Sequence, residues 1–328
     1  MPKMNISFKI SFLLILRDLA FTKTLTLPPV AIGNHSTFPT LPVYVPIPPV
    51  PPGFELDTIW DESKPISPIG VYTAVINLMW ELSNQSWTAQ IDPKRPGPVV
   101  LALDNRVFAV TTIDGPTLQV GHVVLAYHQT VLDMYKRRPG FFTAITRIML
   151  DGQRIGRAGL LPEPPLLGNP NSTMPDLVNT VNPPLVSSTK SVAENSGVVI
   201  DPEDPRFSVS WRFDGTSIPA QELFSSVIDG IATVAQYETN AQCASVTGVS
   251  FSGNVAFHVD DYLGAALHCG QISKAFLFIS VVVFENRKFE GVEITLEYDN
   301  ITIGTGDIFK VRSVESHYSN STARIATS

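Results

Sequence analysis

The chain has 328 residues, of which 44% are hydrophobic and 16% are charged. This composition excludes a disordered chain, and the length predicts two domains rather than one. The net charge of −7 and the lack of a long basic run exclude binding to nucleic acid or to an anionic membrane surface, because phosphate binding needs clustered Lys and Arg.

The first residues have the pattern of a secretory signal. Lys3 and Lys9 precede an apolar run over residues 10–16, which resembles the positive and hydrophobic regions of a signal peptide. We therefore predict a signal peptide over residues 1–22. The run is too short to span a bilayer, as is the apolar run at residues 275–284, so we predict no transmembrane helix.

Proline divides the rest of the chain into modules. Nine prolines fall within residues 28–52, and a second proline-rich stretch begins at Leu161. Proline fixes the backbone and removes hydrogen-bond donors, so both stretches are predicted to be extended connections. The predicted boundaries are a lead-in at 23–53, module 1 at 54–162, a linker at 163–204, module 2 at 205–310 and a flexible tail at 311–328.

Module 1 begins with an alternating strand that ends near Trp60, and an amphipathic helix follows from about Ile66. Two short strands come next, near 99–103 and 107–113. A second helix is predicted over residues 118–135. The module closes with a hairpin over residues 141–156, whose turn is Asp151-Gly152.

Module 2 repeats this order at an offset that drifts from 152 to 148 residues. Its strand ends near Trp211, its first helix begins at Ile218, and its hairpin turns at Asp299-Asn300. Its second helix is predicted over residues 262–284. A strand at 277–284 is an open alternative, because that run is rich in β-branched residues.

The predicted fold class is therefore α+β: two tandem, diverged copies of a β-α-β-β-α-β-β unit, with helices packed on one face of an antiparallel sheet. The first six elements have the order of a ferredoxin-like fold. If the second helix is a strand, each unit instead resembles the cystatin and hot-dog folds. We expect the two modules to pack on each other.

Secretion predicts two covalent modifications. Cys243 and Cys269 are the two cysteines of the chain, and we expect them to form a disulfide. N-glycosylation sequons predict modification at five sites of the mature chain, in addition to one at Asn5 within the signal. These sites are Asn34, Asn84, Asn171, Asn300 and Asn320.

No catalytic, cofactor or metal site is predicted. The nucleophile-elbow, zincin, P-loop and dinucleotide-binding motifs are absent from the sequence. His122 and His128 are six residues apart, which does not place them on one helix face, and His268 lacks nearby ligands. Arg154 and Arg157 lie in a glycine-containing hairpin, which we interpret as structural. The acidic pair Asp260-Asp261 is interpreted as a helix cap.

The paired helices, the segment Val123-Val124-Leu125-Ala126-Tyr127 and the hairpin segment 150–156 resemble a group of secreted two-module proteins of filamentous fungi that have no assigned function. The resemblance covers about residues 54–310 and implies an extracellular protein, but it transfers no catalytic residue.

The leading hypothesis is a non-catalytic extracellular protein that acts in the cell wall or at a surface, with cell-wall carbohydrate or a surface protein as its partner. One alternative is a secreted hydrolase with carboxylates in an inter-module cleft. The other is a carrier of apolar ligands.

Overall fold

The computed structural model describes residues 50–91, 99–101, 107–137, 140–162, 180–181 and 195–311. The predicted signal peptide, most of the lead-in and the tail lie outside these residues. So do the sequons at Asn34, Asn171 and Asn320.

Module 1 contains a six-stranded sheet, called sheet 1, with two helices on its inner face. Its elements in chain order are β1 (Phe54–Pro65), α2 (Pro68–Ser83), β2 (Val99–Leu101), β3 (Phe108–Ile113), α3 (Val120–Lys136), β4 (Phe142–Leu150), β5 (Gln153–Leu161) and β6 (Thr180–Val181). The strand order across sheet 1 is β1-β4-β5-β3-β2-β6, and all neighbours are antiparallel except β2 and β6.

Module 2 repeats the arrangement with a second six-stranded sheet, called sheet 2. Its elements are β7 (Ser196–Ile200), β8 (Phe207–Ser217), α4 (Ala220–Val234), β9 (Ser245–Val249), β10 (Val255–Asp261), α5 (Cys269–Asn286), β11 (Glu290–Tyr298) and β12 (Ile301–Lys310). The order β7-β8-β11-β12-β10-β9 contains the same five-strand core as sheet 1. The α+β class and the two tandem copies of the unit are thus confirmed.

The repeat extends to individual hydrogen bonds. The N–H of Ile66 donates to the carbonyl of Phe141, and the N–H of Ile218 donates to that of Phe289. A bulge follows Ile148 in β4, and the equivalent bulge follows Leu296 in β11. Ile66 and Ile218 are 152 residues apart, whereas Phe141 and Phe289, like Ile148 and Leu296, are 148 residues apart. The sequence predicted both offsets.

Both hairpins use the predicted turns. Asp151 and Gly152 have φ of 50° and 73°, and Asp299 and Asn300 have φ of 52° and 62°. Positive φ at both central residues is the type I′ geometry that fits the twist of two paired strands. Asp, Asn and Gly tolerate this region better than other residues, which explains why they occupy the two turns.

Four details of the structure either differ from the sequence-based prediction or resolve an alternative that it left open. Residues 277–284 are helical, within α5, and this helix begins at Cys269 rather than near Tyr262. Trp60 is equivalent to Phe213, because the pairing of β1 with β4 matches that of β8 with β11 at an offset of 153.

Two strands occupy part of the predicted linker, since β6 pairs with β2 and β7 pairs with β8. The ferredoxin-like analogy also fails at the level of the sheet, because β1 lies at an edge and β5 separates β4 from β3.

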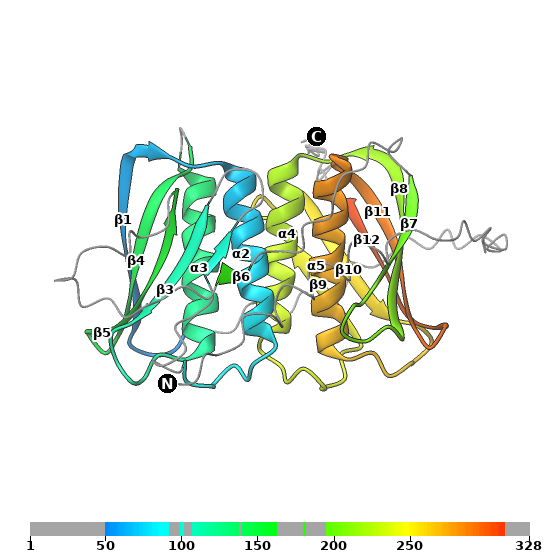
Figure 1. The fold of residues 1–328 in the computed structure, drawn as a ribbon, viewed down its shortest axis with the longest axis horizontal. Coiled ribbons are helices and arrows are strands. Elements are labelled where there is room, and N and C mark those ends of the chain that lie inside the picture. The colour runs from blue at the N-terminus through cyan, green and yellow to red at the C-terminus, as the bar shows by residue number, and fades with distance from the viewer. Residues whose placement is uncertain are drawn as a thin grey trace, which may run out of the picture.

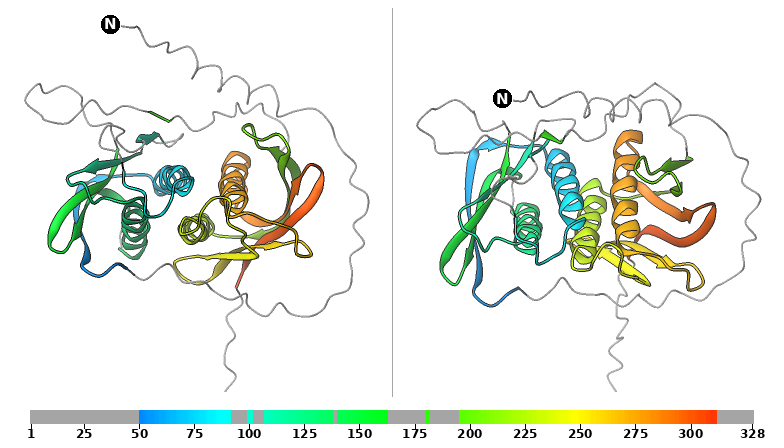
Figure 2. Two further views of the ribbon diagram at one scale, coloured as in Figure 1. Left: turned by 90° about the horizontal axis from the view of Figure 1, so that it is seen from below. Right: turned by 60° about the horizontal axis from the view of Figure 1, so that its bottom comes forward.

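The two modules form one body, with the helices in the middle and the two sheets outside (Figures 1 and 2). Helices α2 and α4, which are equivalent in the repeat, pack against each other at the centre. The rings of Tyr72 and Phe224, also equivalent, stack across this contact at a centroid distance of 6.0 Å. Most buried apolar residues of both modules form one continuous core, and Phe108, Val110 and Leu161 form a small separate cluster.

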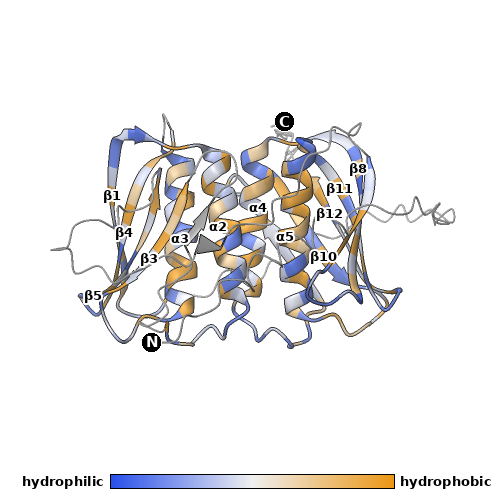
Figure 3. Ribbon diagram, in the orientation of Figure 1, coloured by the Kyte–Doolittle hydropathy of each residue, from blue (hydrophilic) through white to orange (hydrophobic). Residues whose placement is uncertain are grey.

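Helix α5 is coloured hydrophobic over most of its length in Figure 3. By length and composition, α5 is the one helix in the described part of the chain that could cross a membrane. However, 56% of it is buried in the fold, and it packs on α4, α2 and β8. Its hydropathy is therefore that of a core helix shared by the two modules.

Candidate functional site

The sequence contains no recognisable catalytic motif, so a functional site is best sought where the two copies meet or where they differ. Three places meet this condition. They are a polar cluster between the modules, the outer faces of the two sheets, and the disulfide.

The polar cluster lies where α3 of module 1 meets α4 and the β9–β10 turn of module 2. We call it the interface cluster, and it consists of His128, Tyr135, Glu222, Asp229, Phe251 and Ser252. Glu222 and Asp229 are seven residues apart on α4, which places them on one face of the helix about two turns apart. Two pairs in this cluster cross the module boundary. His128 contacts Asp229, and Tyr135 contacts Glu222.

Asp229 is satisfied from both modules. Its Oδ1 lies 3.3 Å from Nε2 of His128, and its Oδ2 accepts the backbone N–H of Val249 at 2.8 Å. The side chains of Asp229 and His128 are both buried. A buried carboxylate is stable only when it is paired and hydrogen-bonded, so Asp229 depends on His128 of the other module.

Glu222 is satisfied in the same way. Its Oε1 accepts the hydroxyl of Tyr135 at 2.5 Å, and its Oε2 accepts the hydroxyl of Ser252. Glu222 also lies in the first turn of α4, where the helix dipole favours a negative charge. Phe251 fills the space between these pairs, with T-shaped contacts to His128 and Tyr135 at 5.3 and 5.8 Å.

The hydroxyl of Tyr72 lies beside this cluster, and no residue that the structure describes forms a hydrogen bond with it. Burial raises the pKa of Tyr72, and the neighbouring Tyr135 and Glu222 raise this pKa further. Tyr72 therefore remains a neutral phenol, and its ring contributes through stacking on Phe224.

A third polar contact joins the modules at the other end of the helices. The hydroxyls of Ser83 in α2 and Ser273 in α5 are 2.7 Å apart, and both residues are buried. Each of the three contacts therefore joins one residue of module 1 to one residue of module 2.

The outer faces of the two sheets differ in chemistry at equivalent positions. The row across sheet 2 is His258, Asp307, Glu293 and Arg212, and the equivalent row across sheet 1 is Val110, Gly159, Ile145 and Ile59. We call these the charged row and the apolar row. Ile59 is 47% exposed and Ile145 is 38% exposed, so part of the apolar row is open to solvent.

The charged row is held by its own hydrogen bonds. His258 contacts Asp260 through Nε2 at 2.5 Å and Thr247 through Nδ1 at 2.8 Å, and Arg212 pairs with Glu293. Burial raises the pKa of Asp307, while His258 opposes this effect. Asp260 thus lies in β10 beside His258, and the interpretation of Asp260-Asp261 as a helix cap is wrong, because His268 caps α5.

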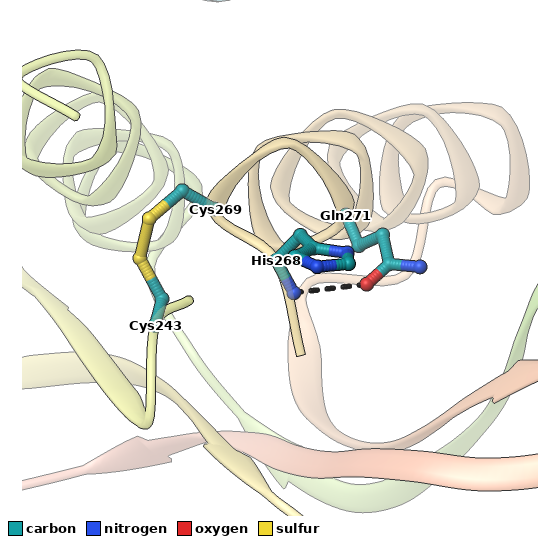
Figure 4. The surroundings of a disulfide bond; sticks show 4 residues. All are labelled: Cys243, His268, Cys269 and Gln271. Carbon is teal, nitrogen blue, oxygen red and sulfur yellow. Dashed lines mark hydrogen bonds between the residues drawn. A yellow bond between two sulfur atoms is a disulfide. The ribbon is translucent and has the colours of Figure 1, made fainter. Parts of the chain in front are cut away.

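The disulfide joins Cys243, just before β9, to Cys269 at the first turn of α5 (Figure 4). The N-terminus of α5 is closed by a capping box, in which the N–H of His268 donates to Oε1 of Gln271 at 2.9 Å. The equivalent box of α3 has Gln119 and His122 in exchanged roles. Cys243 and Cys269 are equivalent to Ile91 and Val120 of module 1, respectively. The backbone N–H groups of these four residues form equivalent hydrogen bonds in the two modules.

The remaining residues singled out in the sequence have structural surroundings. His122 stacks on Phe54 at 5.4 Å, and burial lowers its pKa. Arg154 and Arg157 both pair with Asp114, at 2.8 and 3.2 Å, so they do not form a free anion site. Within the described residues, no group of three or more His, Cys, Asp or Glu side chains could hold a metal ion.

The interface cluster could not be predicted from sequence motifs because its members are far apart in the chain. His128 and Asp229, for example, are 101 residues apart. A signal was present in the repeat itself, because His128, Tyr135 and Glu222 align with Leu277, Phe284 and Gly70. A polar residue at a buried position whose equivalent is apolar points to a contact that only one copy makes.

Glu285, in the last turns of α5, makes stability depend on pH. Burial raises its pKa from 4.5 to about 7, so the folded state binds more protons than the unfolded state between these values. Stability therefore falls as pH rises through this window. Glu285 as a whole is exposed, however, so solvent screening weakens this effect. We expect Glu285→Gln to stabilise the protein by less than about 1 kcal/mol at pH 8 and by still less at pH 5, measured by urea unfolding at both values. Equal effects at both pH values would contradict this assignment.

Comparisons with known proteins place the chain in no family. No family model matches the sequence, and no curated protein matches it. One similar solved structure is the tandem DUF26 ectodomain of the cysteine-rich receptor-like protein PDLP5 from Arabidopsis thaliana. It has a TM-score of 0.21 and 10% identity over 78% of this chain and 98% of that chain.

Another similar structure is a conserved protein of unknown function with a hot dog fold from Alicyclobacillus acidocaldarius. It has a TM-score of 0.12 and 12% identity over 71% of this chain and 99% of that chain. Both scores are too low for the likeness to carry an argument.

Proposed function

We propose that the chain is a secreted, non-catalytic protein that binds a surface protein through the outer face of sheet 1. The observation that carries this proposal is the apolar row. At two of the four positions, where sheet 2 has Arg212 and Glu293, sheet 1 presents Ile59 and Ile145, which are exposed to solvent. Apolar side chains exposed on a sheet face are typical of a protein contact.

The disulfide supports secretion. Cys243 and Cys269 are the two cysteines of the chain, and both are bonded. Disulfides form and persist in oxidising compartments and are rare in the cytosol. The apolar start of the sequence and the resemblance to secreted fungal proteins agree with this localisation, which remains part of the proposal.

The hydrolase alternative finds less support in the interface. Glu222 and Asp229 lie on one helix, both are buried, and each of their oxygens already has a partner within the protein. The carrier alternative requires a space between the helices and the sheet. In module 2 this space is filled where Gly248 meets the backbone of α4 and where Phe257 packs on Phe276.

Binding is tested with the secreted protein and cell-surface material from the producing organism. We expect retention of the wild type, and loss of retention when the material is treated with protease or when Ile59 and Ile145 are both replaced by Ser. The matched control replaces Arg212 and Glu293, at the equivalent positions of sheet 2, and should retain binding. Retention that survives protease treatment and both isoleucine substitutions would contradict the proposal.

Glycosylation gives a second test of secretion. Asn84, the C-cap of α2, and Asn300, in the β11–β12 turn, are both exposed in the structure. We expect each to carry a glycan, so that Asn84→Gln and Asn300→Gln each lower the intact mass by one glycan. An enzyme that removes N-glycans should abolish the difference. Recovery of the secreted wild-type chain without modification at both positions would contradict the prediction.

A further inference from the structure

The inter-module interface has approximate twofold symmetry in its shape. Equivalent helices α2 and α4 pack on each other, and the contact between α3 and α4 is equivalent to that between α5 and α2. The stacked rings of Tyr72 and Phe224 are equivalent residues. Such an interface is the covalently linked counterpart of a symmetric dimer, in which the same patch of each subunit meets its copy.

The chemistry of the interface does not share this symmetry. His128 and Asp229 are in contact, while the positions equivalent to them hold Leu277 and Asn77. Tyr135 and Glu222 are in contact, and their equivalents are Phe284 and Gly70. Ser83 and Ser273 correspond to Ala235 and Val124, which are apolar.

This difference has a consequence for which modules can pair. If two copies of module 2 were paired through α4 in the same geometry, each Asp229 would face the position of Leu277 and each Glu222 that of Phe284. Both carboxylates would be buried without the donors that His128 and Tyr135 supply. Leaving a buried charge unpaired is a common way in which proteins exclude a wrong partner.

We propose that these three polar contacts are specificity contacts, which make the helical face of module 2 accept module 1 and reject a second copy of module 2. The two modules present similar apolar helices, so burial alone does not distinguish the correct pair from a pair of identical modules. The polar contacts supply this distinction, as buried polar residues do in coiled coils.

The tether between the modules also favours the correct pair, so it has to be cut to test the contacts. A protease site is inserted in the full chain between Val181 and Asn195, and the folded protein is cleaved there. Cleaved protein is then mixed with a ¹⁵N-labelled preparation, in urea below the unfolding midpoint, and examined by native mass spectrometry. The appearance of 1:1 pairs with mixed labels shows that the halves have exchanged.

We expect the exchanged wild type to contain pairs of one module 1 with one module 2. In the variant His128→Leu with Asp229→Asn, which copies the equivalent pair, we expect pairs of identical modules to increase at least about tenfold. The amide introduced at position 229 can still accept the N–H of Val249, which preserves the local structure. Tyr135→Phe with Glu222→Ala is a second variant, and it should act in the same direction.

Two results would overturn the proposal. One is the formation of module 2 pairs by the wild type after exchange. The other is exclusive 1:1 pairing in both variants once mixed-label pairs have appeared. As a matched control, Asn77→Leu alters the equivalent position on α2, whose side chain donates to Thr73 within its own helix, and it should leave pairing unchanged.

Discussion

Replacing Asp229 by Ala is expected to lower the free energy of unfolding by about 3 kcal/mol. The substitution removes the partner of buried His128 and the acceptor of the Val249 N–H, so two polar groups lose their bonds at once. Chemical unfolding of the full chain measures the loss. Asp229→Asn keeps the acceptor for Val249 and should cost less.

The repeat offers a matched control for this substitution. Asn77 occupies the equivalent position on α2, and its side chain donates to the carbonyl of Thr73 within the same helix. We expect Asn77→Ala to cost less than about 1 kcal/mol, as for a residue whose bonds stay within its helix. If Asn77→Ala and Asp229→Ala lowered the free energy of unfolding equally, the contact between His128 and Asp229 would contribute nothing to stability.

Removing the disulfide is the second substitution with a large expected effect. The bond joins residues 26 apart, and closing a loop of this length restricts the unfolded chain by about 3 kcal/mol. We therefore expect Cys243→Ala with Cys269→Ala to unfold at a lower urea concentration. The same comparison can be made on the wild type with and without a reducing agent.

Module 1 suggests how to recover part of this loss. Its equivalent positions hold Ile91 and Val120, both of which are buried. The pair Cys243→Ile with Cys269→Val should therefore be more stable than the double-Ala variant, because it restores apolar burial without a covalent bond. An Ile-Val variant no more stable than the double-Ala variant would contradict the equivalence of the two loops.

Local patterns predicted much of the fold from the sequence. Alternating strands, amphipathic helices and the Asp-Gly and Asp-Asn turns recur in both copies, and each depends on neighbouring residues alone. The run at 277–284 was ambiguous, because a buried helix and a buried strand are both apolar on all sides. Its burial between sheet 2 and the helices of both modules explains this composition.

Other features depended on contacts that no local pattern contains. β6 and β7 are short strands that add to the edges of sheets already formed, within a stretch rich in proline and polar residues. The interface cluster needs α3, α4 and the β9–β10 turn together, so it becomes visible only when both modules are in place.

The two copies form one body, and its stability depends on polar contacts that occur at one side of the interface and not at the equivalent side. Hydrogen exchange of the Asp229→Ala variant measures this dependence, with peptides compared from all four helices. We expect α2 and α3 of module 1 to lose protection together with α4, although the substitution lies in module 2. Loss of protection confined to module 2, with α2 and α3 unchanged, would contradict this expectation.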